Sequence, residues 1–329
     1  MTLSRRVRGL LLVASTGLMA ACAGATIADR PRAPEAKAAV PLSELWIEPT
    51  DLAERNLFWG SGRQDSAPSS NVEYKVVKLD TTGYSKGYDV TGPDGRKWAI
   101  KLGKEAQPEI VVSRILWALG YHQPETYYLT GWRLAGTWES EGEPARFRLQ
   151  SDHETDGEWK WLENPFKDTV PLRGLIGINL LVMNWDFKTG NNRIYRLRDA
   201  TAEPRRRYVV QDLGASLGRP PVLPGIIRGT RNDIDDYESL NLTKKVLGSK
   251  VELDYRSVRR DVIEIMSITD VIWGCELMNR LTDAQLDDAF KAAEYAPSIR
   301  QRYITKLRAK IQEGLALRPG QEARSRKQG

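Results

Sequence analysis

The feature that most constrains the fold of this chain is an apolar run that ends in a cluster of polar residues. Residues 175–183 are almost entirely apolar, and they lead directly into Asn184-Trp185-Asp186. Lys188 and Asn191 follow within five residues of Asp186. Asp and Asn are ordinary turn formers, so this cluster alone predicts no more than a polar turn after a buried helix.

A second carboxylate follows another apolar run. Residues 208–210 are Tyr-Val-Val, and the chain then reads Gln211-Asp212-Leu213-Gly214. Here too a glycine and an aspartate are compatible with a simple turn. The order of the two clusters along the chain, and the residues that precede them, indicate more than turns.

A lysine lies inside an apolar run well before both clusters. Lys101 belongs to 98–102, which we predict to be a strand, and lysine is rarely placed in a core unless it is paired. Its candidate partner is Glu109, near the start of a helix that Pro108 opens and Gly120 ends. The alternative is an edge-strand lysine that points into water.

These residue types match the needs of phosphoryl transfer. That chemistry requires a carboxylate to orient the attacking group, oxygen ligands for Mg²⁺ and a cation on the phosphates. Asp186 is the candidate for the first role, Asn191 and Asp212 for the second, and Lys101 for the third. Lys188 is placed to reach the transferred phosphate, and Asn192 is the alternative to Asn191 because the two are adjacent.

A resemblance supports this assignment. The stretch 109–116, followed by Gly120 and Pro124, resembles the lysine-partner helix of secretory-pathway casein kinases and CotH spore-coat kinases. The clusters at 184–186 and 211–214 are similar to the same family and to HipA-like kinases. The resemblance covers about residues 72–220.

The resemblance implies an α+β, two-lobed, protein-kinase-like fold. The N-terminal lobe would be a small antiparallel sheet with one helix, and the C-terminal lobe would be mainly helical. Lys101 and Glu109 would bind ATP or another nucleotide, with Mg²⁺ or Mn²⁺ on Asn191 and Asp212. Ordinary kinases carry His-Arg where this chain has Asn184-Trp185. Because that arginine is missing, we do not expect activation by phosphorylation of a loop that the arginine would bind.

Two glycines occupy the loop between the first two predicted strands. Gly83 and Gly87 could cover nucleotide phosphates through backbone N–H groups. A plain hairpin loop explains them equally well.

The N-terminus has the pattern of a bacterial lipoprotein signal. Arg5, Arg6 and Arg8 precede the apolar stretch 10–19, and Ala20-Ala21-Cys22 follows. The apolar stretch is too short for a permanent transmembrane helix. We therefore expect lipidation of Cys22 and a place in the bacterial cell envelope, facing the periplasm or the exterior; a plain secretory signal is the alternative.

Charge and composition set the domain boundaries. The net charge of +6 is concentrated in the signal and in the tail, which leaves the body near neutral and argues against nucleic acid as a partner. We expect a signal peptide (1–21), a tether (22–41), an N-terminal extension (42–71), an N-lobe (72–150), a C-lobe (151–317) and a basic tail (318–329). Beyond the extended segment 215–230, we expect the C-lobe to be helical, including one helix over 263–281.

The function predicted from the sequence is ATP- and Mg²⁺-dependent phosphoryl transfer by an exported, lipid-anchored protein. The acceptor is a protein or a small molecule that the sequence does not identify. ATP is expected to be scarce outside the inner membrane, and this leaves two alternatives. One is a pseudokinase-like module that binds a nucleotide or a partner, and the other is kinase-fold transfer of a different group.

Overall fold

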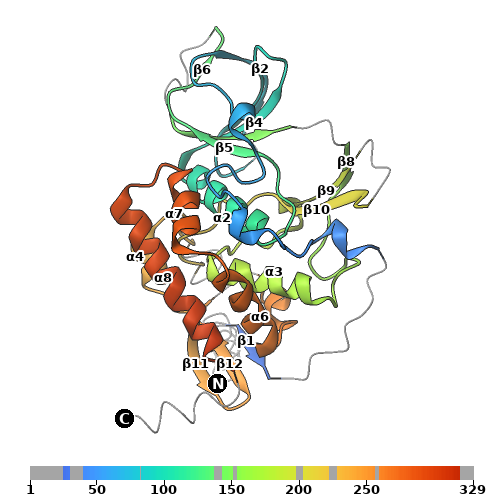
Figure 1. Ribbon diagram of the computed structural model, residues 1–329, viewed down its shortest axis with the longest axis vertical. Coiled ribbons are helices and arrows are strands. Elements are labelled where there is room, and N and C mark those ends of the chain that lie inside the picture. The colour runs from blue at the N-terminus through green and yellow to red at the C-terminus, as the bar shows by residue number, and fades with distance from the viewer. Residues whose placement is uncertain are drawn as a thin grey trace, which may run out of the picture.

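The computed structural model describes residues 25–29, 40–81, 83–136, 143–150, 154–197, 203–221, 228–255 and 259–318. The signal peptide, Cys22 and most of the predicted tether and tail lie outside these residues. Within them the chain forms the α+β, two-lobed fold predicted from the sequence (Figure 1).

The small lobe is a six-stranded sheet with the order β5-β7-β4-β3-β2-β6. Its strands are β2 (Glu73–Asp80), β3 (Gly87–Thr91), β4 (Lys97–Leu102), β5 (Thr126–Leu129), β6 (Arg133–Leu134) and β7 (Ala145–Leu149). All pairs are antiparallel except β2 with β6. Trp98 and Ile100 on β4 join the buried cluster of this lobe, so the intervening Ala99 and Lys101 face the opposite side of the sheet.

Helix α2 (Ala106–Ala118) covers that opposite side and follows the short 3₁₀ turn η4 (Gly103–Glu105). It ends where Gly120 adopts a φ of +95°. A Cβ at this position would overlap the carbonyl oxygen of Ile47 in the N-terminal extension, so glycine is required for both conformation and space. The extension packs on the core as predicted, with Leu45, Leu52 and Leu57 buried.

The large lobe contains the remaining helices and two small sheets. Its helices are α3 (Val170–Leu181), α4 (Ile234–Glu238), α5 (Arg260–Glu264), α6 (Ile268–Asn279), α7 (Asp283–Lys291) and α8 (Pro297–Leu315). One sheet has the order β10-β9-β8, with β8 (Glu154–Gly157), β9 (Asn192–Arg196) and β10 (Arg206–Val210). The other has the order β1-β12-β11, with β1 (Thr26–Ala28), β11 (Thr243–Leu247) and β12 (Lys250–Leu253).

Three expectations from the sequence are wrong, two about the large lobe and one about the tether. The segment 243–253 is a β-hairpin, because Gly248-Ser249 forms its turn and the alternate residues Val251 and Leu253 enter the core. The helix expected over 263–281 is two helices, because Ser267 starts α6 with a capping box that includes Asp270. Part of the predicted tether is strand β1, paired with β12.

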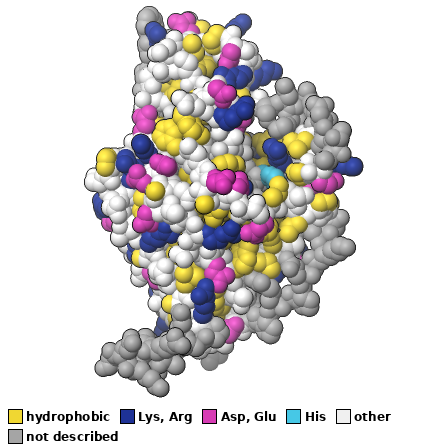
Figure 2. Space-filling view, in the orientation of Figure 1, with side chains coloured by type: hydrophobic (Ala, Val, Ile, Leu, Met, Phe, Trp, Pro, Cys, Tyr) yellow, Lys and Arg dark blue, Asp and Glu magenta, His cyan; other side chains and the backbone are white. Residues whose placement is uncertain are grey.

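The surface agrees with the near-neutral body predicted from the sequence. Figure 2 shows acidic and basic side chains interspersed over the face in view. Charged side chains of the described chain also pair with each other, such as Arg302 with Glu238 and Arg300 with Asp287. None of the described helices is both long and apolar enough to span a lipid bilayer.

Candidate active site

A cavity of about 360 Å³ gathers most of the predicted site residues from both lobes. It is lined by Gly83, Gly87, Lys101, Asp186, Lys188, Asn191 and Asp212. Glu109 lies behind Lys101, with 1% of its side chain exposed. Residues separated by more than a hundred positions in the sequence therefore meet at one place.

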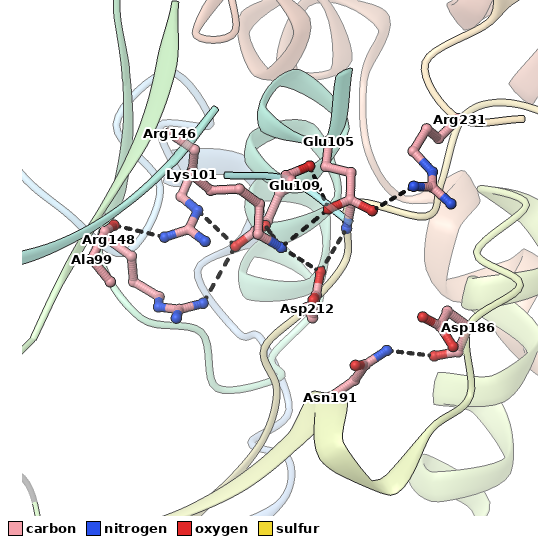
Figure 3. A network of polar contacts seen from close by, with 12 residues as sticks. Ala99, Lys101, Glu105, Glu109, Arg146, Arg148, Asp186, Asn191, Asp212 and Arg231 are labelled. Atoms are coloured by element: carbon pink, nitrogen blue, oxygen red, sulfur yellow. Dashed lines mark hydrogen bonds and ion pairs between the residues drawn. The ribbon is translucent and has the colours of Figure 1, made fainter. Parts of the chain in front are cut away.

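Lys101 projects from β4 into a ring of carboxylates (Figure 3). Its ammonium lies 3.1 Å from Oε2 of Glu109 and 2.8 Å from Oδ1 of Asp212. A third carboxylate, Glu105 at the end of η4, is 3.6 Å away. The ion pair predicted between Lys101 and Glu109 is present, and the alternative of an edge lysine in water is wrong.

Glu109 serves more than one cation. Its Oε1 forms an ion pair with Arg146 Nε at 2.8 Å and accepts a hydrogen bond from Arg148 Nη1 at 3.4 Å, and both arginines lie on β7. The two arginines alternate with Phe147, so their side chains leave the same face of the sheet. These two arginines were not predicted, although Arg-Phe-Arg within an apolar strand is the same kind of signal as Lys101.

The charges shift each other's protonation. Burial favours the neutral amine of Lys101, but the carboxylates of Glu109 and Asp212 outweigh it and raise the pKa of Lys101. Burial likewise opposes the carboxylate of Asp212, but Lys101 lowers the pKa of Asp212 to about 2. Burial lowers the pKa of Arg146 to about 10, despite the neighbouring Glu109. Both Lys101 and Asp212 are therefore charged at neutral pH.

The loop after α3 carries Asp186 into the cavity. Lys188 Nζ lies 2.9 Å from Oδ2 of Asp186, and Asn191 Nδ2 donates to the backbone oxygen of Asp186 at 2.8 Å. The backbone oxygen of Asn191 accepts from the N–H groups of Gln211 and Asp212, at 2.8 and 3.3 Å. This loop is thus fastened to the segment that bears Asp212.

Asn192, the alternative to Asn191, turns away from the cavity. It is fully buried, and its Nδ2 donates to the backbone oxygen of Trp159 at 2.9 Å. Of the two adjacent asparagines, only Asn191 lines the cavity with Asp212.

Glycines position two walls of the cavity. Gly87 pairs with Lys101, and an added Cβ would lie 2.6 Å from the backbone oxygen of Ile100. Gly214 passes so close to Glu105 that an added Cβ would lie 2.5 Å from the Cβ of that residue. Gly83 meets no such crowding. The close approach of β3 to β4 is therefore sufficient reason for Gly87, with or without a phosphate.

The mouth of the cavity is held by a cross-lobe contact that the sequence did not reveal. Arg231, which directly follows the predicted segment 215–230, lies 2.9 Å from Oε1 of Glu105. Its guanidinium stacks 3.7 Å from the ring centre of Tyr84 in the β2–β3 loop. Ser85, next to Tyr84, donates to Oε2 of Glu105 at 2.9 Å. These four residues join the loop, the start of α2 and the C-lobe segment.

The donor atoms fit a hard divalent cation held partly by a ligand. The described residues contain no group of three His, Cys, Asp or Glu side chains that could hold a metal ion by themselves. Asn191 uses its amide nitrogen on Asp186, which leaves its amide oxygen as the donor atom for a metal. An amide oxygen and the Asp212 carboxylate, completed by phosphate oxygens and water, form an oxygen-only set that suits Mg²⁺.

A second cavity of about 420 Å³ adjoins the first. Arg148, Arg193 and Gln211 line both, so the two form one cleft. The second cavity runs between β7 and the β8–β9–β10 sheet, where Leu149, Thr155 and Val209 also line it. The combined volume of the cleft is large enough for a ligand much larger than a phosphate group.

No family model matches the chain, and no curated protein matches it. Among solved structures, the chain is similar to the Helicobacter pylori proinflammatory kinase CtkA, with a TM-score of 0.43 and 13% sequence identity. The similarity covers 74% of this chain and 92% of that one. Conclusions about activity therefore depend on the geometry of this chain's own residues.

Proposed function

We propose that this chain is a kinase-like phosphotransferase that uses ATP or another nucleotide with Mg²⁺ or Mn²⁺. The observation that supports it best is the position of Lys101, paired with Glu109 and Asp212 in a cavity that Asp186 also lines. A structural ion pair needs neither a cavity nor a third carboxylate beside it. The bound nucleotide and its cation would supply the phosphoryl group and neutralise its charge.

Each side chain has a role in this proposal. Lys101, oriented by Glu109, binds phosphate oxygens, while Asp212 and Asn191 hold the cation. Asp186 orients the acceptor and takes its proton. Lys188, whose side chain is 73% exposed, contacts the acceptor and the phosphoryl group that is transferred to it.

The nucleoside end would enter the second cavity. Arg148, Arg193 and Gln211 connect that cavity to the Lys101 site. A ligand with its phosphates at Lys101 can therefore extend between the lobes into that cavity.

A thermal-shift screen of nucleotides, with and without Mg²⁺ or Mn²⁺, tests the proposal. A ligand at 100 times its Kd stabilises the native state by about 2.7 kcal/mol, so binding should raise Tm by several degrees. We expect the rise to require both nucleotide and metal. No change in Tm with any nucleotide and either cation would refute the proposal.

Transfer is separated from binding by Asp186→Ala. Because Asp186 acts on the acceptor, this variant should keep the nucleotide- and metal-dependent rise in Tm and lose release or transfer of the terminal phosphate. If wild type binds nucleotide but shows no more phosphate loss than Asp186→Ala, the chain is a nucleotide-binding module of the pseudokinase kind.

We also propose that the protein is anchored at the bacterial cell envelope through a lipid on Cys22, facing the periplasm or the exterior. The basis is the signal pattern of residues 1–22. Mass spectrometry of the membrane fraction should find a mature N-terminus at a diacylglyceryl-modified Cys22. An unmodified N-terminus at another residue would show that the signal is an ordinary secretory one.

A further inference from the structure

The tip of the β11–β12 hairpin, residues 244–250, exposes apolar side chains at an end of the molecule. Val246 is 44% and Leu247 50% exposed, whereas Val251 and Leu253 of β12 are fully buried. The hairpin is thus anchored in the core by one strand and presents its other strand to the surroundings. Figure 1 shows it at the opposite end of the molecule from β2 and β6.

Lysines flank the two apolar residues along the hairpin. Lys244, Lys245 and Lys250 are all exposed. Lys244 pairs with Glu252 at 2.9 Å, while Lys245 and Lys250 have no ion pair within the described part of the chain. Exposed apolar side chains flanked by lysines suit the interface of a bilayer that contains anionic lipid, where the apolar groups enter and the ammonium groups meet headgroups.

The N-terminal strand lies directly beside this tip. Strand β1 pairs with β12, with Ala28 opposite Lys250, and Asp29 N–H donates to the oxygen of Ser249 at 2.6 Å. Ala25 and Ile27 are buried, so the segment is fixed to the body. The packed part of the chain begins at Ala25, inside the predicted tether of 22–41. Only residues 22–24 therefore precede it.

Covalent reach then restricts where a bilayer can lie. Three extended residues span at most about 10 Å, so Cys22 stays within that distance of Ala25. Strand β1 runs toward the tip, and at about 3.4 Å per residue the tip is roughly 14 Å from Ala25. A lipid on Cys22 holds the membrane close to this end of the molecule and not to the far lobe.

We propose that the hairpin tip is a membrane-contact surface, which takes an anionic phospholipid bilayer as its partner. The proposal rests on lipidation of Cys22 but not on the kinase-like activity. The outer face of β2 is equally apolar, with Val77 66% and Leu79 49% exposed, but it belongs to the opposite end of the molecule. It therefore provides a matched control.

The test uses the full, processed chain in vesicles of phosphatidylglycerol and phosphatidylcholine, after its mass has confirmed the lipid on Cys22. An environment-sensitive fluorophore is attached at Leu247→Cys or, as control, at Val77→Cys. Cys275 is buried and burial raises its thiol pKa to about 12, so it does not compete for the label. We expect the label at 247 to emit at shorter wavelength and to be quenched by spin-labelled lipid, while the label at 77 behaves as in water.

Charge reversal provides the second arm. Lys245→Glu with Lys250→Glu should reduce the quenching at 247 several-fold, whereas Lys75→Glu with Lys78→Glu on β2 should leave it unchanged. Equal emission and quenching at 247 and 77 would overturn the proposal. The proposal would also be overturned if quenching at 247 were the same with lysine and with glutamate at positions 245 and 250. The mass of the N-terminal peptide shows separately whether Cys22 carries the lipid.

Discussion

Glu109 has more contacts with cations than the sequence suggested. With 1% of its side chain exposed, it faces Lys101, Arg146 and Arg148 at 3.1, 2.8 and 3.4 Å. Removal of one partner from a buried charge network leaves the others uncompensated, which costs about 3–5 kcal/mol. The residue therefore supports both the N-lobe and the position of Lys101.

Glu109→Gln should accordingly lower the free energy of unfolding by about 3–5 kcal/mol and weaken nucleotide binding together. Urea denaturation and nucleotide titration of the same samples measure the two effects. Glu276→Gln is the control, because Glu276 pairs with Arg318 at the surface with 47% of its side chain exposed. If both variants unfold like wild type, the buried network does not hold Lys101.

The pair of Lys101 and Asp212 predicts a pH dependence. The pKa of Asp212 is lowered to about 2 in the folded protein, from an ordinary value near 3.9. The stability contributed by this carboxylate is therefore complete above about pH 4 and is lost as pH falls toward 2. The pKa of Lys101 is raised, so its contribution is complete below its ordinary value and is lost only in strong alkali.

Urea unfolding of wild type and Asp212→Asn between pH 2.5 and 6 measures this dependence. The stability difference between the two proteins should be constant from pH 5 to 6 and shrink steadily below about pH 4. Asp212→Asn should also abolish metal-dependent nucleotide stabilisation at neutral pH. A difference that stays constant down to pH 2.5 would mean that Asp212 is not an ionised partner of Lys101.

At the level of single residues, local context made some of the site predictable. Lys101 in an apolar strand, and Asp186 and Asp212 after apolar runs, are visible in the sequence because each breaks a local pattern. Arg231 and Glu105 break none, since their role arises from contacts between segments far apart in the chain. Long-range pairing of that kind leaves no mark in a single sequence.

Among the elements, the β2–β3 loop and the segment after Gly214 are joined by Arg231. Its contacts with Glu105 and Tyr84 link the two lobes at the mouth of the cavity. Arg231→Ala should therefore free the loop. We expect faster amide hydrogen exchange over 83–87 and a several-fold higher KM for the nucleotide, while kcat changes less.

Arg228→Ala is the matched control for that experiment. Arg228 belongs to the same segment and is exposed, and no hydrogen bond or ion pair joins it to another described residue. Its replacement should leave exchange in the loop unchanged. Equal exchange in wild type and both variants would show that Arg231 does not restrain the loop.

Elements with a strong repeat were predictable, and those decided by one residue were not. Strand β4 and helix α3 lie where continuous apolar runs predicted them. The break between α5 and α6 depends on Ser267, whose capping box competes with an otherwise helical pattern. The hairpin at 243–253 was missed because its apolar residues are few, although Gly248-Ser249 is a typical two-residue turn.

For the whole molecule, the two lobes enclose a cleft that charged side chains line in both of its cavities. Strand β1 fixes the N-terminal segment to the large lobe, at the end that is opposite the small lobe. If Cys22 carries a lipid, the small lobe points away from the bilayer. The acceptor would then approach from the aqueous side.

A crystal structure with a non-hydrolysable nucleotide and Mg²⁺ tests the central claim most directly. We predict that Lys101 Nζ lies beside the phosphates and that Asp212 and the Asn191 amide oxygen bind the metal. We also predict that the nucleoside occupies the cavity lined by Arg148 and Gln211, and that Asp186 faces the terminal phosphate. Nucleotide bound elsewhere, with Lys101 still paired to Asp212 and no metal between Asp212 and Asn191, would contradict the account.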